Sequence, residues 1–107
     1  MELCVNDTIT ADSTPDDVVR ALDAAPHPPG WYLILESDDA LIEAGAEPDG
    51  RYTVSGSDRG RELEARTLLD AVKFRAVLLK FLAGDTTWRE ASFWTLYRVC
   101  SRRLLSP

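Results

Sequence analysis

Hydrophobic and polar residues alternate along short stretches in the middle of the chain, and this alternation predicts strands. In residues 61–66, Leu63 and Ala65 alternate with charged residues, and residues 51–55 alternate in the same way around Tyr52. Because successive side chains of a strand point to opposite faces, each stretch should show one face to water. The pattern is typical of strands in a sheet that packs on the core with one face and is exposed to water on the other.

Four further stretches have strand character. The uninterrupted apolar run at residues 31–35 is typical of a central strand that is covered on both faces. Further strands are predicted at residues 1–5, 41–46 and 94–99, and a helix over residues 89–104 is an alternative to the last one. Short turns rich in Gly, Pro and Asp separate the middle strands, which predicts an antiparallel meander.

A first helix is predicted between Thr14 and Ala24. Thr14 supplies a hydroxyl at the N-cap, Pro15 suits the first turn, and the two following aspartates lie near the positive end of the helix dipole. Its apolar side consists of Val18, Val19, Leu22 and Ala25. The proline-rich residues 26–30 end this helix.

A longer helix is predicted from Leu68 to Leu82 with its end near Ala83, and Gly84 fits the position just after that end. Six apolar residues fall on one arc at helical spacing, and we expect this arc to face the core: Leu68, Ala71, Val72, Leu78, Leu79 and Leu82. Arg75 projects near the middle of the same arc. We expect it to pair with a sheet carboxylate, first Glu36 or Glu43, or else to extend its stem along the sheet edge with its head in water.

These elements predict an α+β fold, in which an antiparallel β-meander of four to six strands carries one long helix on a face and a shorter N-terminal helix. A length of 107 residues suits a single domain that spans residues 1–107. Residues 101–107 are expected to form a mobile tail with two positive charges. Of Trp31, Trp88 and Trp94, we expect at least two to be substantially buried.

The charge balance narrows the choice of partners. Eighteen acidic and twelve basic residues give a net charge of -6, so the basic surface that nucleic-acid binding requires is missing and a basic protein partner is favoured. The sequence has no signal-peptide pattern and no apolar run long enough to span a membrane, which predicts a cytoplasmic location without membrane contact. Cys4 and Cys100 are too few and too far apart for a metal cluster, so we expect free thiols, no metal and no cofactor.

No catalytic residue is predicted. His27 stands between prolines without a recognisable catalytic neighbour, which favours a structural or solvent role. The glycines at 56 and 60 lack the lysine of a phosphate-binding loop. The strand carboxylates Glu36, Glu43, Glu62 and Glu64 could converge as a pair for glycoside hydrolysis or metal binding. A solvated polar face explains them better, and as partner-binding residues of an acidic docking surface we select Glu43, Glu62 and Glu64.

Residues 31–36, 50–55 and 81–94 contain an aromatic-aliphatic strand after Gly30, a meander strand, and a helix end Phe-Leu-Ala-Gly-Asp followed by two tryptophans. In this order the chain resembles small immunity-type proteins of bacterial polymorphic toxin and contact-dependent inhibition systems. The resemblance implies a non-catalytic protein that binds and neutralises a cognate basic toxin by covering it. The first alternative is a secretion or assembly chaperone that binds an extended partner segment. The second alternative is a small enzyme of unknown type. The chain could also form a homodimer.

Overall fold

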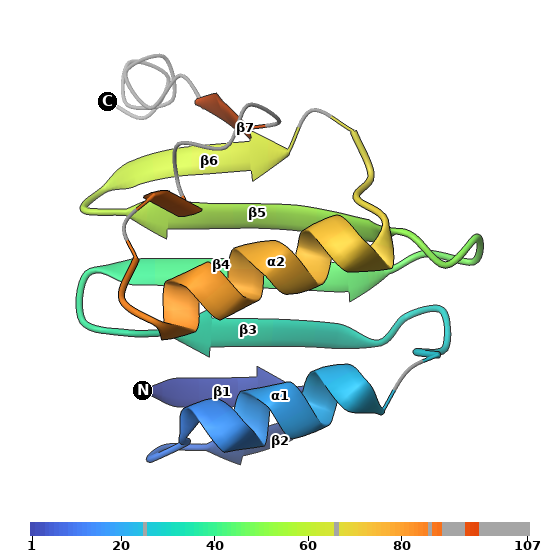
Figure 1. Cartoon of the computed structure of the whole chain (residues 1–107), viewed down its shortest axis with the longest axis horizontal. Coiled ribbons are helices and arrows are strands. Elements are labelled where there is room, and N and C mark those ends of the chain that lie inside the picture. Colours follow the sequence, from blue (N-terminus) through green and yellow to red (C-terminus); the bar gives the residue numbers. More distant parts are fainter. Residues whose placement is uncertain (25, 66, 86, 89–93, 97–107) are drawn as a thin grey trace, which may run out of the picture.

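The computed structural model describes residues 1–24, 26–65, 67–85, 87–88 and 94–96. These residues form one antiparallel sheet of seven strands and two α-helices, and both helices lie on the same face of the sheet (Figure 1). The predicted α+β class, with an antiparallel sheet and two helices, is therefore confirmed.

The sheet has the strand order β2-β1-β3-β4-β5-β6-β7. Its strands are β1 (Glu2–Val5), β2 (Thr8–Thr10), β3 (Tyr32–Glu36), β4 (Ala40–Ala46), β5 (Tyr52–Asp58), β6 (Arg61–Ala65) and β7 (Trp94–Leu96). Consecutive strands from β3 to β6 are neighbours, which makes the predicted meander. The number of strands exceeds the predicted four to six, because the turn at Asn6 and Asp7 leads directly into β2 as a hairpin partner of β1. Residues 94–96 form a strand, and the other residues of the alternative helix, 89–93 and 97–104, lie outside the described residues.

Helix α1 (Pro15–Asp23) matches its prediction closely. The Thr14 hydroxyl accepts a hydrogen bond from the Asp17 backbone N–H at 3.3 Å, and the Asp17 carboxylate accepts one from the Thr14 N–H at 2.8 Å. This reciprocal capping satisfies two backbone donors that a helix N-terminus leaves without partners. The cap also lowers the pKa of Asp17, chiefly through the hydrogen bond from the Thr14 backbone.

Helix α2 (Ala71–Leu82) begins later than predicted. Leu69 exchanges backbone hydrogen bonds with Tyr52 at 2.8 and 2.9 Å, so the chain at this point extends the sheet. The Asp70 side chain then caps the helix by accepting a hydrogen bond from the Lys73 N–H at 2.8 Å. The predicted end is confirmed, because Ala83 is the C-cap and Gly84 follows with φ +73°.

The buried side of α2 differs from the predicted arc. Its buried residues are Phe74, Val77, Leu78 and Phe81. By contrast, the side chains of Val72 and Leu79 are 78% and 39% exposed. The helix carries two apolar sides, and the side with both phenylalanines faces the sheet because aromatic side chains remove the most apolar surface from water. The expectation that Leu79 faces the core is wrong.

The core fills the space between the helices and the sheet. Figure 1 shows α1 in front of β1 and β2, with α2 in front of the middle strands. Leu33 and Leu35 of β3 are fully buried on this side, whereas Tyr32 and Ile34 on the other side are half-buried. The expectation that β3 is covered on both faces is therefore correct for one face only. Trp31 and Trp88 are both buried, as expected for two of the three tryptophans.

Candidate functional site on the open face of the sheet

The face of the sheet opposite α1 and α2 carries the predicted partner-binding residues; we call it the open face. Its side chains alternate along each strand with the core residues, and strand pairing aligns them in rows. One row consists of Cys4, Ile34, Glu43, Ser55 and Glu64. The next row consists of Glu2, Glu36, Leu41, Ser57 and Glu62.

All three selected glutamates lie on the open face. Glu43 and Glu64 are exposed in the same row and are separated by Ser55 of β5, whereas Glu62 is half-buried in the next row. Because neighbouring strands lie about 4.8 Å apart, the backbones of Glu43 and Glu64 are about 10 Å apart. The three residues therefore share one face of the sheet, although they differ in exposure.

The open face is strongly acidic. Across β1 to β6, the described residues of its two rows include five glutamates and no lysine or arginine. Glu2 and Glu36 are direct cross-strand partners, a like-charge arrangement that costs stability in a sheet. The five glutamates concentrate negative charge in these two rows, and such a charge attracts cationic groups.

A hollow of about 680 Å³ lies in this face. Its lining includes Glu43 and Glu64 together with Tyr32, Ile34, Thr53, Ser55 and Leu68. At its floor, Gly45 pairs with Tyr32 on one side and with Thr53 on the other, so that no side chain fills the space between them. A Cβ atom at Gly45 would lie 3.1 Å from Thr53 Oγ1. The hollow combines two carboxylates with apolar and hydroxyl groups.

Tyr32 borders the hollow and was missed as a site residue. Its hydroxyl donates to Asp7 Oδ1 at 3.5 Å, and its backbone N–H donates to Asn6 Oδ1 at 3.1 Å. Burial, with further contributions from Cys4 and Asp7, raises the pKa of Tyr32 above its usual value. The available sequence signal was alternation within residues 31–35, which places Tyr32 with Ile34 opposite Leu33.

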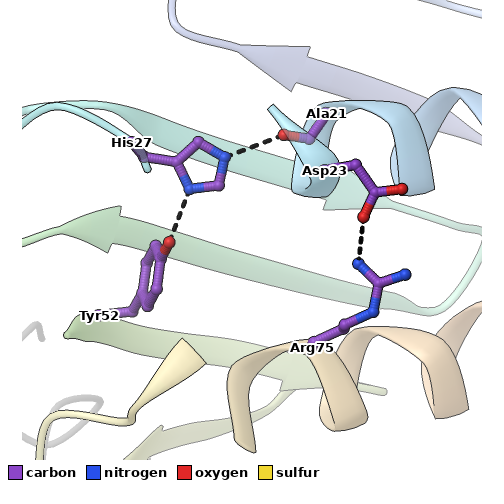
Figure 2. Close-up of polar contacts among 5 residues, drawn as sticks. All are labelled: Ala21, Asp23, His27, Tyr52 and Arg75. Atoms are coloured by element: carbon purple, nitrogen blue, oxygen red, sulfur yellow. Dashed lines mark hydrogen bonds and ion pairs between the residues drawn. The ribbon is translucent and has the colours of Figure 1, made fainter. Parts of the chain in front are cut away.

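A second polar arrangement surrounds His27, at the other side of the sheet (Figure 2). His27 Nε2 lies 2.9 Å from the Ala21 carbonyl oxygen, and Nδ1 lies 2.6 Å from the Tyr52 hydroxyl oxygen. Since a carbonyl only accepts, Nε2 carries a proton and donates to Ala21, and the tautomer with the proton on Nε2 leaves Nδ1 to accept from the Tyr52 hydroxyl. The ring also stacks on Trp31 with centroids 3.8 Å apart. These contacts tie α1 to β5 and to Trp31, just before β3, so of the structural or solvent role that the sequence favours, the structural one is seen.

Arg75 does not pair with Glu36 or Glu43. Its Nη1 atom lies 2.6 Å from Asp23 Oδ1, at the end of α1 (Figure 2). The prediction is wrong because the arc on which it rested was misplaced: Arg75 lies at the edge of the buried side of α2 and points toward the neighbouring helix. Both side chains are about half-exposed, so this ion pair links α1 and α2 without a buried charge.

Cys4 is a free thiol whose Sγ lies 3.1 Å from the Asn6 carbonyl oxygen, and Cys100 lies outside the described residues. Within the described part of the chain, no group of three or more His, Cys, Asp or Glu residues is placed to hold a metal ion. Neither of the two helices described is long and apolar enough to cross a membrane.

Comparison of the chain with protein-family models, with curated proteins and with solved structures finds no match. The open face and its hollow are therefore interpreted from their own geometry and charge.

Proposed function

We propose that the protein is a non-catalytic binding domain that covers a basic protein partner with the open face of its sheet. One observation carries this proposal: five glutamates and no basic residue occupy the two described rows from β1 to β6, around a hollow that Glu43 and Glu64 border. Lysine or arginine side chains of a partner would relieve the repulsion between these carboxylates.

The hollow gives this surface a place for a specific contact. A cationic side chain of the partner would enter between Glu43 and Glu64, while its aliphatic stem would lie against Tyr32 and Ile34. Charge complementarity of this kind accelerates association and fixes orientation more than it raises final affinity. Contacts with the half-buried apolar residues would slow dissociation.

In this proposal the biological role is that of an immunity-type protein, which neutralises a basic toxin by steric and electrostatic cover. The resemblance of residues 31–36, 50–55 and 81–94 to such proteins supports this role. A chaperone that binds an extended segment is the second candidate, because β2 forms one edge of the sheet and all three of its residues are exposed. A partner strand added there would pair with only a short edge.

The test uses the product of the adjacent reading frame as the partner, co-expressed with this chain. We expect the double variant E43K/E64K to lower the association rate about tenfold or more at low salt, and to lose much of its salt dependence. The matched control is D12K/D38K, which changes the net charge equally at two exposed positions outside the two rows of the open face. Binding kinetics on a surface with the partner immobilised, at low and at high salt, measure the association rates of both variants.

Two outcomes would contradict the proposal. If E43K/E64K and D12K/D38K slow association equally, net charge alone attracts the partner and the open face is not the binding surface. If neither has an effect but Ile9→Pro in β2 abolishes binding, the partner adds to the sheet edge, and the chaperone candidate replaces the immunity role.

A further inference from the structure

The outward side of α2 is apolar where a helix on a sheet normally shows polar residues. Val72, Ala76, Leu79 and Ala83 are all exposed. Their spacings of four, three and four residues place them along one line of the helix, opposite the side that carries Phe74 and Phe81. We call these four residues the outer stripe. Its two large members, Val72 and Leu79, are 78% and 39% exposed.

The charge beside the outer stripe is opposite to that of the open face. Helix α2 contains Lys73, Arg75 and Lys80 and no acidic residue. Lys73 and Lys80 lie seven residues apart and therefore share one flank of the stripe, and neither forms an ion pair with a described residue. Arg75 lies on the other flank and is neutralised by Asp23. The stripe is thus a small apolar surface beside two lysines. Asp85, just after the helix, interacts electrostatically with Lys80: hydrogen bonds from Thr87 chiefly lower the pKa of Asp85, and the charge of Lys80 contributes to this.

We propose that the outer stripe binds an amphipathic helix of a protein partner that carries carboxylates beside its own apolar stripe. Ala76 and Ala83 let a second helix approach closely, and Val72 and Leu79 provide the side chains that insert between its residues. The carboxylates of the partner would lie next to Lys73 and Lys80. This surface is on the opposite side of the sheet from the open face, so both could be occupied at once.

Charge complementarity favours an acidic helix over a second copy of this chain. In an antiparallel pair of two α2 helices related by a two-fold axis, the flank with Lys73 and Lys80 would face the same flank of the other copy. Like charges would then meet along the seam. An acidic amphipathic helix replaces this repulsion with attraction and buries the same apolar residues.

The probe is a synthetic helical peptide about three heptads long, with leucine and alanine along one stripe and glutamates on both flanks. A matched peptide has lysines in place of the glutamates. Titration of the labelled peptides with the full chain, followed by fluorescence anisotropy, should show the acidic peptide binding about tenfold or more tightly than the basic one. Added salt should reduce this difference.

Variants of the chain sharpen the assignment. V72Q/L79Q should weaken binding of the acidic peptide about tenfold, whereas Ile9→Gln, at an apolar residue that is 65% exposed elsewhere, should leave it unchanged. K73E/K80E should reverse the preference between the two peptides. The variant E43K/E64K should bind the acidic peptide like the unmodified chain, so this test can fail or succeed independently of the proposed function.

The proposal is overturned if neither peptide binds, if both bind equally, or if V72Q/L79Q has no effect while thermal unfolding shows that it is folded. Sedimentation velocity of the chain alone supplies a further check. A concentration-dependent dimer that V72Q/L79Q dissociates would show that a second copy, and not an acidic helix, occupies the outer stripe.

Discussion

The two faces of the sheet are built from the same strands but have opposite surroundings. In β4, Ile42 is fully buried beneath the helices, while the next residue, Glu43, is exposed on the open face. In β6, buried Leu63 is followed in the same way by exposed Glu64. A shift of one residue in strand register would exchange these environments. The open face is therefore fixed by the same alternation that forms the core, and a binding surface needs no separate structural element.

Helix α2 repeats this contrast around its own axis. Both of its sides are apolar, yet Phe74 and Phe81 are buried and Val72 and Leu79 are not. Hydrophobicity alone did not distinguish the two sides, because the count of apolar residues is similar on each. Side-chain size decides between them, since the larger aromatic residues gain more from burial against the sheet.

The largest difference in stability is expected between alanine variants of two adjacent leucines of α2, which are chemically identical but lie on different sides of the helix. Leu78 is fully buried and Leu79 is 39% exposed. Leu78→Ala should lower the free energy of unfolding by about 2 to 5 kcal/mol, because it leaves a cavity in the core. Leu79→Ala should cost less than about 1 kcal/mol. Urea denaturation of both variants measures the difference, and equal losses would mean that α2 packs on a different side.

The sequence predicted those elements whose signals are local. The Thr14-Pro15 cap and Gly84 fixed two helix ends, and the turns between β3, β4, β5 and β6 defined the meander. It failed where the decision depended on contacts far apart in the chain. The pairing of Leu69 with Tyr52 shortened α2 at its start, and the approach of α1 gave Arg75 its partner in Asp23.

The candidate site was predictable to a similar extent. Alternation in β6 placed Glu62 and Glu64 on the face opposite the helices without knowledge of the fold. The expectation that both point into solvent holds for Glu64, whereas Glu62 is half-buried. The hollow was not predictable, because it arises where Gly45 of β4 meets Tyr32 and Thr53 in register. The contact of His27 with Tyr52 likewise joins residues 25 positions apart, and no spacing within the sequence indicates it.

The second-largest loss of stability is expected from alanine substitution of a strand glycine, and the two glycines Gly56 and Gly45 should differ in its size. At Gly56, a Cβ atom would lie 2.7 Å from the Leu41 carbonyl oxygen, a backbone atom of the paired strand that cannot move alone. At Gly45, it would lie 3.1 Å from Thr53 Oγ1, which a side-chain rotation can displace. Gly56→Ala should therefore cost about 1 to 3 kcal/mol, and Gly45→Ala less than about 1 kcal/mol. Thermal and urea unfolding test this order, and a milder effect at Gly56 would contradict the register of β4 and β5.

The smallest loss of stability is expected from a substitution of Tyr52, which is buried on the core side of the sheet. Its hydroxyl contacts His27, and its ring stacks on Phe74 of α2. Tyr52→Phe keeps the stacking on Phe74, whose ring centroid is 4.3 Å away, but leaves His27 Nδ1 without its donor. At neutral pH we expect a loss of about 1 kcal/mol in the free energy of unfolding.

The loss caused by Tyr52→Phe should also depend on pH in a defined direction. Burial raises the pKa of Tyr52 in the folded protein above its usual value near 10. Its contribution to stability is therefore complete below the unfolded-state pKa and is lost as the pH rises through the folded-state pKa, because the unfolded chain ionises first. Tyr52→Phe lacks this ionisation, while Tyr32 remains in both proteins. The stability difference between the two proteins should thus shrink between about pH 9 and pH 11. Urea denaturation across this range measures it, and a constant difference would show that the Tyr52 hydroxyl is not buried as described.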